Sequence, residues 1–484
     1  MKSALIALAG PTLLGICILV GLAGCDPCGS CPRVIPTTTA TTTPAPTRTP
    51  LPSPTPTPIP TSTPTPTGTG TATATATPTA TPTLAPEACL PSSSIGVLVQ
   101  GTNATAYAPQ GDWGGPVGSG GVAVVPLETS AGVGTGGPAV VVPTRDTVNS
   151  CSSNSTTGDT VCVANGTDVY ILNGTTLKNT LTSAGTGTVS FTGGSCTTCG
   201  VVVDSSTNTA QLAIAKSDSP SSSAYQALHL STNTFDLPVD SPTGVSEDIA
   251  VDPIRHLILS PNERGNYELA KIGASTQVFT NQIVPIPTPT PVGAPNPGPD
   301  LDSAGEDCTT GIALSTDEFT GLLFIADLTQ ATFVSGAPGT WHAPSQFQDF
   351  PEFGSLAAGT SGIAVAPGTH LALVTGEFGG SVEGVIQLPS TSGSGIPSVV
   401  DWVAFTMPND PSGTPWAQGF DPHPTTAYVS PNSGKAYGVL GNEAFSFLAV
   451  VDLDGLLKAK RSAAHTVDPT LDLVALKLVT FVAE

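Results

Sequence analysis

Short apolar runs separated by Gly, Pro, Asn and Ser fill the chain from about residue 90 to its C-terminal end. Runs of about four to eight apolar residues bounded by such turn formers are typical of β-strands. Pairs of runs recur as a hairpin unit, in which a run such as Ile-Ala-Val precedes Asp or Ser, then Pro or Ser, and then a second run. Copies of this unit occupy residues 200–215, 248–262, 311–327, 362–377 and 426–442.

The spacing of the copies indicates a β-propeller. The last apolar residues of the first runs are Val203, Val251, Leu314, Val365 and Val429, with a weaker copy near Val141. The five steps average about 58 residues, and repeats of roughly 40 to 60 residues with several strands each are typical of propeller blades. We therefore predict an all-β fold with seven blades, six being the alternative count. On the strand pattern alone, a β-sandwich or a pair of β domains is the alternative architecture.

The two ends of this domain predict how the ring closes. Residues 95–125 contain apolar runs for a first blade without its inner strand, and residues 471–482 contain one further apolar run. We expect the last strand to complete the first blade, because such closure removes exposed sheet edges.

The hairpins resemble those of bacterial surface propellers of the YVTN and NHL repeat classes. The best match is TAYVSPNSGKAYGV at residues 426–439, beside the apolar–Ser-Pro-Asp-Gly-Lys–apolar turn of those repeats. The resemblance covers the first two strands of each blade, and Asn432-Ser433 replaces the usual Asp. It implies a propeller domain exposed outside the cytoplasm.

Residues 1–24 are predicted to be a lipoprotein signal peptide. Lys2 precedes an apolar run that ends in Leu22-Ala23-Gly24-Cys25, and a short apolar core ending in small residues indicates a secretory signal. The ending resembles a bacterial lipobox, which implies that Cys25 is lipidated and begins the mature chain. A simple cleaved signal or an uncleaved anchor is the alternative.

Residues 25–88 are predicted to link the lipid to the propeller at residues 89–484. The Pro/Thr-rich tract 36–86 contains one charge, Arg48, and no aromatic residue. Such a segment buries too little apolar area to offset the entropy of ordering, so we expect a disordered, extended linker. The domain is then a monomer held by its lipid in the bacterial cell envelope, in the periplasm or at the cell surface.

Composition and charge exclude two classes of protein. Gly (53) and Pro (48) together make up about a fifth of the 484 residues, which excludes an all-α protein because both residues disfavour helices. The net charge of −22, from 14 basic and 36 acidic residues, excludes a nucleic-acid-binding protein, which needs a basic surface to displace counterions.

The number of cysteines is consistent with export from the cytoplasm. Apart from Cys17 and Cys25, eight cysteines remain, and an even number in an oxidising compartment predicts disulfides. The predicted pairs are Cys151–Cys162, Cys196–Cys199, Cys28–Cys31 and Cys89–Cys308.

Acidic residues are the candidate ligand-binding groups. In propellers, the segment before each inner strand and the loop after the second strand open on one face, which usually holds the ligand. The acids that suit Ca²⁺ in such a mouth, including a possible calcium loop at 300–307, are Glu247, Asp248, Asp300, Asp302, Glu306 and Asp307. Further candidates for the same face are Glu263, Asp327, Glu377, His423 and Glu443. The alternative is that these are solvated loop residues of an acidic protein.

Two functions remain. We favour a non-catalytic binding module for a protein, glycan or small ligand, because the sequence provides no convincing general base, nucleophile or histidine cluster. His256 and His370 occupy the same point of two hairpins and are interpreted as solvated strand residues. The alternative is a Ca²⁺-dependent hydrolase or lyase, similar to lactonases, with its metal in the acidic mouth.

Overall fold

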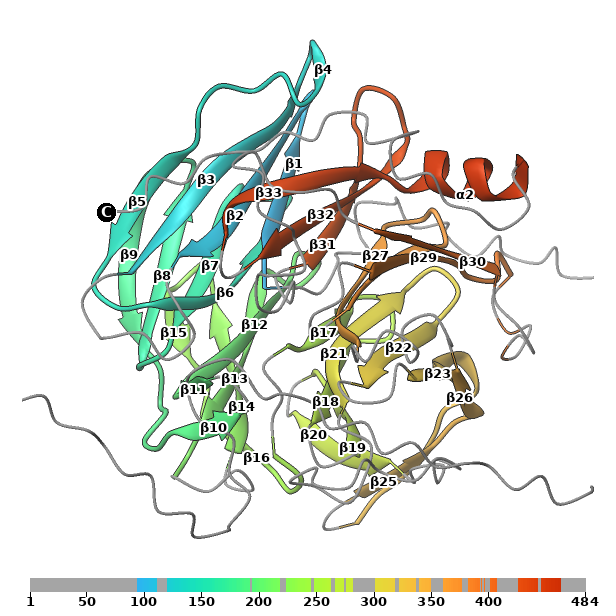
Figure 1. The fold of residues 1–484 in the computed structure, drawn as a ribbon. Helices are drawn as coiled ribbons and strands as arrows, with labels where there is room; N and C mark the ends of the chain where they lie inside the picture. Colours follow the sequence, from blue (N-terminus) through green and yellow to red (C-terminus); the bar gives the residue numbers. More distant parts are fainter. Residues whose placement is uncertain are drawn as a thin grey trace, which may run out of the picture. The chain divides into compact units, whose positions relative to one another are not determined.

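Seven β-sheets of three or more strands follow one another in the part of the chain that the structure describes (Figure 1). The computed structural model describes residues 94–110, 120–191, 194–217, 223–244, 248–262, 266–273, 276–281, 301–317, 322–336, 339–349, 360–376, 382–391, 393, 396, 401–406, 425–442 and 445–462. All of these residues belong to the unit Ala80–Glu484.

The sheets are numbered here as blades 1 to 7 in chain order. Blade 1 contains β1 (Gly96–Gln100), β2 (Asn103–Gln110), β3 (Gly120–Thr129), β4 (Gly132–Val133) and β5 (Val140–Thr144). Blade 2 contains β6 (Val148–Ser153), β7 (Asp159–Ala164), β8 (Asp168–Asn173) and β9 (Thr176–Thr182). A separate hairpin, β10 (Val189–Phe191) and β11 (Gly194–Cys196), precedes blade 3. Blade 3 contains β12 (Thr198–Asp204), β13 (Thr209–Ala215), β14 (Ser223–His229), β15 (Thr234–Phe235) and β16 (Val239–Ser241).

The remaining blades continue the order. Blade 4 contains β17 (Ala250–Asp252), β18 (Leu257–Asn262), β19 (Asn266–Lys271) and β20 (Gln277–Asn281), extended by β25 (Gly339–His342) and β24 (Thr332–Val334). Blade 5 contains β21 (Leu301–Asp307), β22 (Ile312–Asp317), β23 (Leu322–Asp327) and β26 (Ser345–Asp349), with the 3₁₀ helix η2 (Leu328–Gln330) after β23. Blade 6 contains β27 (Thr360–Ala366), β28 (Leu371–Gly376), β29 (Val382–Gln387) and β30 (Asp401–Thr406). Blade 7 contains β31 (Thr425–Val429), β32 (Ala436–Asn442) and β33 (Phe445–Asp452), and the helix α2 (Leu453–Ser462) follows it.

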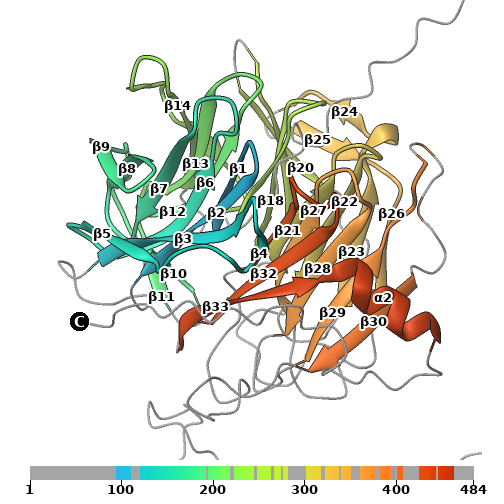
Figure 2. The ribbon, with the colours of Figure 1, turned by 90° about the horizontal axis from the view of Figure 1, so that it is seen from above.

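The blades form a closed ring. Their first strands contact one another in the cyclic order β1, β6, β12, β17, β21, β27 and β31, and β31 contacts β1 again. Figure 2 shows the sheets succeeding one another around the ring in the order of their colours. The predicted seven-bladed β-propeller is therefore confirmed, and the sandwich alternative is excluded.

The strands of the ring are buried on both faces, which explains their continuous apolar runs. In β12, Val203 packs between blades 2 and 3, whereas its neighbour Val202 packs between blades 3 and 4. Because successive side chains of a strand point to opposite faces, each blade contributes to two cores.

The true repeat is more regular than the sequence indicated. Inner strands begin at residues 96, 148, 198, 250, 301, 360 and 425, which gives steps of 52, 50, 52, 51, 59 and 65 residues. Two of the sequence anchors were misplaced: Leu314 lies in β22, the second strand of blade 5, and Val141 lies in β5, an outer strand of blade 1. The inner strand β21 was missed because its sequence, LDSAGED, is polar.

The prediction that residues 95–125 lack an inner strand is wrong. The strand β1 is the inner strand of blade 1, because it contacts both β6 and β31, and its sheet is complete with β2, β3 and the outer strands β4 and β5. Residues 471–482, expected to supply that strand, lie outside the described residues.

The chain of blade 5 supplies two strands to blade 4. The hairpin β24–β25 follows β23 of blade 5 in the chain, yet β25 pairs in parallel with β20 of blade 4. Trp341 of β25 is buried and its Nε1 donates to the carbonyl of Tyr267 in β19, 3.3 Å away. The outer edge of blade 4 is thus built from the chain of blade 5.

A helix follows directly after each of two strands, η2 after β23 and α2 after β33. The Asp327 side chain accepts a hydrogen bond from the Thr329 amide and caps η2, and Asp452 accepts one from the Gly455 amide in the first turn of α2. Such capping satisfies amides that have no partner within the helix. No helix in the described ranges is both long and apolar enough to cross a bilayer.

Two predicted disulfides are confirmed. Cys151 bonds Cys162, across the β6–β7 pair, and Cys196 bonds Cys199 at the start of blade 3. Cys308 is also disulfide-bonded, but its predicted partner Cys89 lies outside the described residues, as do Cys28 and Cys31.

Candidate functional site

Each blade has two ends of different character. At one end the inner strand begins and the second strand ends, and we call this end the entrance face. At the other end a tight turn joins the first strand to the second, and we call this end the turn face. Because ligands of propellers usually bind at the entrance face, this face is the candidate functional site.

Four inner strands begin with an irregularity at the entrance face. The register with the second strand shifts between Val148 and Ser150 in blade 2 and between Thr198 and Gly200 in blade 3. It also shifts within 301–304 of blade 5 and within 360–363 of blade 6. Such bulges bend a strand and redirect a side chain, and they are common beside binding sites.

The bulges place polar side chains between neighbouring blades. In blade 2, Asn149 Nδ2 donates to the Thr198 carbonyl of blade 3, 3.1 Å away. In blade 5, Ser303 Oγ donates to Asp248 Oδ2 of blade 4 at 3.1 Å and accepts from the Ile363 amide of blade 6 at 3.2 Å. The side chains of Asn149, Ser303 and Asp248 are all buried, so hydrogen bonds join blades 2 and 3, blades 4 and 5, and blades 5 and 6 at this face.

Four buried polar side-chain atoms at the entrance end of blade 2 have no hydrogen-bond partner among the described residues. Thr147 Oγ1, Asn149 Oδ1 and both amide atoms of Asn165 are buried and make no hydrogen bond within the described residues. The backbone places them together, because the Asn165 amide donates to the Thr147 carbonyl and the Asn165 carbonyl accepts from the Thr197 amide. Buried polar atoms without partners are costly, and these four lie together at the entrance face, where they are the candidate recognition groups.

An exposed arginine, Arg145, lies two residues before Thr147 in the chain. Arg145 Nε and Nη2 donate to the two carboxylate oxygens of Asp168, at 2.9 and 2.5 Å, while 76% of the Arg145 side chain is exposed. Tyr170 also donates to Asp168, and burial together with this bond raises the pKa of Tyr170. The guanidinium is therefore held in one orientation at the surface and keeps free N–H donors.

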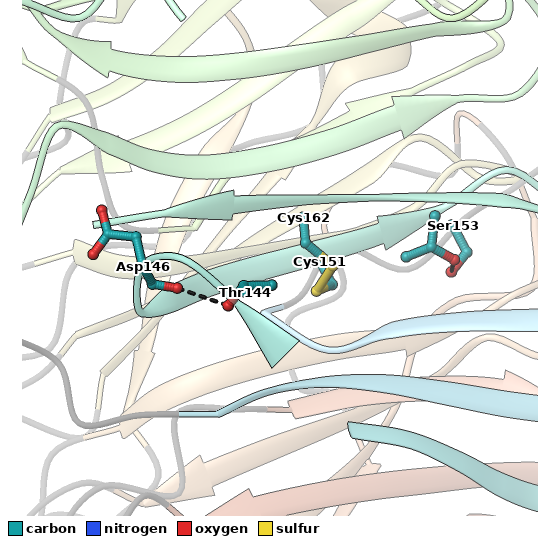
Figure 3. The surroundings of a disulfide bond; sticks show 6 residues. Thr144, Asp146, Cys151, Ser153 and Cys162 are labelled. Carbon is teal, nitrogen blue, oxygen red and sulfur yellow. Dashed lines mark hydrogen bonds between the residues drawn. A yellow bond between two sulfur atoms is a disulfide. The ribbon is translucent and has the colours of Figure 1, made fainter. Parts of the chain in front are cut away.

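Figure 3 shows this corner of blade 2. Thr144 Oγ1 donates to the Asp146 carbonyl at 2.8 Å, and the Cys151–Cys162 disulfide lies along the same pair of strands. Asp146 in turn accepts from the amides of Thr147 and Gly166. The segments before β6 and after β7 are thus fixed to each other at the entrance face.

A buried acid, Glu383, lies near the entrance end of blade 6. It is the second residue of β29, and its Oε2 accepts from the Gly376 amide at 3.2 Å, whereas Oε1 has no hydrogen-bond partner among the described residues. Burial raises the pKa of Glu383 to about 8, so the carboxyl is protonated in the folded protein at neutral pH. The sequence analysis missed this residue, although a single acid inside an apolar strand is a usable signal.

The turn face has a different and repetitive structure. In six blades, the turn after the inner strand contains one residue with a positive φ, four positions after the residue at which the turn begins. These residues are Gly158, Asn208, His256, Gly311, His370 and Gly434. The turns begin at Asn154, Asp204, Asp252, Asp307, Ala366 and Ser430. Five of these side chains accept hydrogen bonds from amides of their own turn, as Asp204 does from Ser206. Asn and Gly are the usual residues at positive φ, and here two histidines adopt it.

The side chains of three of these left-handed residues, Asn208, His256 and His370, reach the turn of the preceding blade, and we call such contacts turn latches. Asn154 Nδ2 donates to Asn208 Oδ1 at 2.8 Å, joining blades 2 and 3. His256 Nδ1 lies 3.7 Å from Asp204 of blade 3, and His370 Nδ1 lies 2.6 Å from Asp307 of blade 5.

Two more blade pairs are joined at the turn face by hydrogen bonds from other residues. Between blades 4 and 5 the left-handed residue is a glycine, and Arg255 of blade 4 instead donates to the Cys308 carbonyl at 3.1 Å. Between blades 7 and 1, Asn432 Nδ2 lies within 2.9 Å of the Glu128 carboxylate and of the carbonyls of Thr102 and Thr129. The blade pair that is furthest apart in sequence is therefore joined by polar groups at this face, in addition to the apolar cluster that the two blades share.

Neighbouring charged side chains shift the pKa values of Glu306, Asp307 and His370 at this face. Burial and the neighbouring Asp252 raise the pKa of Glu306, while Arg255 Nη1 lies 2.8 Å from Asp252 Oδ2 and 3.6 Å from Glu306 Oε1. Although burial opposes it, hydrogen bonds from His370 and Thr309 lower the pKa of Asp307, and the bond to Asp307 raises the pKa of His370. These side chains form the packing between blades.

The structure separates the acids that the sequence analysis grouped. Asp248 and Asp302 lie at the entrance face. Glu306 and Asp307 end β21 and Asp327 ends β23, so these three lie at the turn face, and residues 301–307 form a strand where a calcium loop was considered. The remaining candidates lie outside the described residues: Cys25, Glu247, Asp300, Glu263, Glu377, His423 and Glu443. Within the described ranges, no three His, Cys, Asp or Glu side chains are grouped as metal ligands.

Comparison with known proteins adds little to this geometry. No family model matches the chain, and no curated protein matches it. Among solved structures, the chain is similar to the β-propeller domain of Cps50 (Swd1) from Myceliophteria thermophila, with 10% sequence identity and a TM-score of 0.43. The similarity covers 63% of this chain and 83% of that one.

Proposed function

We propose that this chain is a lipid-anchored, extracytoplasmic propeller that binds a polar ligand at its entrance face without turning it over. The observation that carries the proposal is the group of unused buried polar atoms on Thr147, Asn149 and Asn165, together with the oriented guanidinium of Arg145. An amide that offers both a donor and an acceptor matches neighbouring hydroxyl or peptide groups of a ligand. A closed ring that presents polar groups at one face suits recognition.

Anchoring is proposed from the sequence alone. The lipobox-like segment ending at Cys25 and the Pro/Thr-rich tract 36–86 are those of a tethered envelope protein. Cys25→Ala is expected to move the protein from the membrane fraction to the soluble fraction, and unchanged retention in membranes contradicts the anchor.

Binding is tested with defined probes. Libraries of oligosaccharides, peptidoglycan fragments and short peptides are screened against the full chain in detergent by thermal shift, and each hit is measured by calorimetry. Asn149→Ala and Asn165→Ala are expected to weaken binding, whereas Asn208→Ala at the turn face serves as the matched control and leaves it unchanged. A ligand whose affinity falls only with the turn-face variant contradicts the proposed site.

A further inference from the structure

The turn latches differ in whether they contain a group that titrates. The latch between blades 2 and 3 joins two neutral amides, those of Asn154 and Asn208. The latch between blades 5 and 6 joins a histidine to a carboxylate, with His370 Nδ1 2.6 Å from Asp307 Oδ2. His370 and Asn208 occupy the same left-handed position of their turns, with φ of 60° and 55°. One place in the repeat thus holds a titratable pair in one blade and a neutral pair in another.

Asp307 is held in place as the anionic member of the pair. Its side chain is 1% exposed, and its Oδ1 accepts from the amide and the hydroxyl of Thr309, at 3.2 and 2.6 Å. The other oxygen, Oδ2, contacts His370. Although burial raises it, the hydrogen bonds from His370 and Thr309 lower the pKa of Asp307, so the carboxylate is ionised at neutral pH.

His370 is the member of the pair that changes charge. Its side chain is 22% exposed, so the ring exchanges protons with the solvent. The hydrogen bond to Asp307 raises the pKa of His370 above the ordinary value of 6.5, although partial burial opposes this. The stabilisation from the pair is therefore complete below pH 6.5 and is lost as the pH rises through the folded value. The neutral imidazole retains at most a hydrogen bond to Asp307, which is weaker than one between two charged groups.

The other charged groups near this pair lie on the opposite side of β21. Successive side chains of a strand point to opposite sides, so Asp307 faces blade 6 whereas Glu306 faces blade 4. The contact of His370 with β29 is neutral, since Gln387 Nε2 donates to the His370 carbonyl at 3.1 Å. The charged residues on the blade 4 side are Asp252, Arg255, Glu306 and Asp327.

We propose that the latch between His370 and Asp307 is a pH-sensitive fastening of blades 5 and 6, tight when the imidazole is protonated and loose when it is neutral. At the entrance face, the same two blades are joined by the hydrogen bond from the Ile363 amide to Ser303 Oγ, which does not titrate. Proton loss therefore acts at the turn face, where the latch lies. This face is opposite to the proposed ligand site, so the test does not depend on that function.

Unfolding at several pH values tests the latch. His370→Asn keeps a residue type that tolerates a positive φ and an N–H donor for Asp307, but it does not titrate. From pH 6 to pH 9, the unfolding constant of the parent divided by that of the variant is expected to rise by at least about threefold. The comparison at each pH cancels the titration of Glu383 and the other acids. If His370→Asn fails to fold, His370→Gly, which introduces the residue type found at this position in blades 2, 5 and 7, provides the same comparison.

A second His–Asp pair provides the matched control. His229 Nε2 lies 3.1 Å from Asp236 Oδ1 on the outer part of blade 3, but the two side chains are 43% and 60% exposed. Exposed ion pairs contribute little to stability and are screened by salt. His229→Asn is therefore expected to change the same ratio by less than about 1.5-fold between pH 6 and pH 9.

Hydrogen exchange followed by mass spectrometry locates the effect. After correction for the intrinsic pH dependence of exchange, the turns 307–311 and 366–370 are expected to lose protection from pH 6 to pH 9 in the parent but not in His370→Asn. The turn 154–158, whose latch is neutral, is the internal reference and keeps its protection. An unchanged ratio of unfolding constants, an equal change with His229→Asn, or an equal loss of protection in all three turns overturns the proposal.

Discussion

Glu383 provides the sharpest quantitative prediction from this structure. The carboxyl is fully buried, and its pKa is raised from the ordinary value of 4.5 to about 8. In the unfolded chain the same carboxyl ionises near 4.5. Between these pH values the folded protein holds a proton that the unfolded chain releases, so stability falls as the pH rises from about 4.5 to 8 and is flat beyond that range.

The magnitude follows from the same values. Each pH unit in this interval costs about 1.4 kcal/mol, so the 2.5 units between 4.5 and pH 7 amount to about 3.4 kcal/mol. Glu383→Gln keeps the shape and keeps an oxygen for the Gly376 amide, but it does not ionise. Relative to their difference at pH 4, the variant is expected to gain about 3 kcal/mol over the parent protein at pH 7.

Urea unfolding followed by tryptophan fluorescence, at several pH values from 4 to 8.5, measures this difference. Other buried acids such as Glu306 and Glu268 also titrate, but they cancel when the two proteins are compared at each pH. Asp240→Asn is the control, since 74% of the Asp240 side chain is exposed, and it should show no such slope. A stability difference between Glu383→Gln and the parent that does not change with pH refutes the reasoning.

Three further predictions concern the ring, the disulfides and metal binding. Asn432→Ala removes three hydrogen bonds between blades 7 and 1 and leaves the buried Glu128 with one partner fewer, so calorimetry should show a loss of roughly 2 kcal/mol; an unchanged melting temperature contradicts the polar closure. Peptide mapping without reductant should recover Cys308 linked to Cys89, and recovery of Cys308 as a free thiol or with another cysteine disproves that pairing. Addition of Ca²⁺ after EDTA treatment should raise the melting temperature if Asp248 and its neighbours hold the metal; identical melting in both conditions counts against the calcium-dependent alternative.

The blade count was accessible from the sequence because each inner hairpin is apolar on both faces. Runs such as Val201–Val203 must be continuous, since each side chain packs into one of two cores. The inner strand of blade 5 departs from this apolar pattern. It contains Asp302, Glu306 and Asp307, all of them buried. His370 of blade 6 pairs with Asp307, and Arg255 of blade 4 lies 3.6 Å from Glu306. No local property of LDSAGED indicates those partners, and so the segment was interpreted as an acidic loop.

The candidate site was predicted only in part. The sequence analysis proposed the same face, and Asp248 lies there, but the groups that distinguish this face in the structure are Asn149, Asn165 and Arg145. Bulges such as the one at Asn149 are set by the register between two strands, which depends on how whole blades pack. An isolated Asn in a Ser-rich strand has no feature that separates it from a loop residue. The histidines show the same limit: His256 and His370 were correctly placed at one point of the repeat, but they join blades.

The two strands that the chain of blade 5 supplies to blade 4 constrain how a molecule of this kind is shortened or lengthened. Most blades here are contiguous stretches of about 50 residues, which gene duplication or deletion changes one at a time. Deleting the chain of blade 5 also removes β24 and β25, and blade 4 then loses the strand that pairs with β20. Blades 4 and 5 are therefore expected to be gained or lost together, whereas blades 2 and 3 each consist of strands from one continuous stretch of chain.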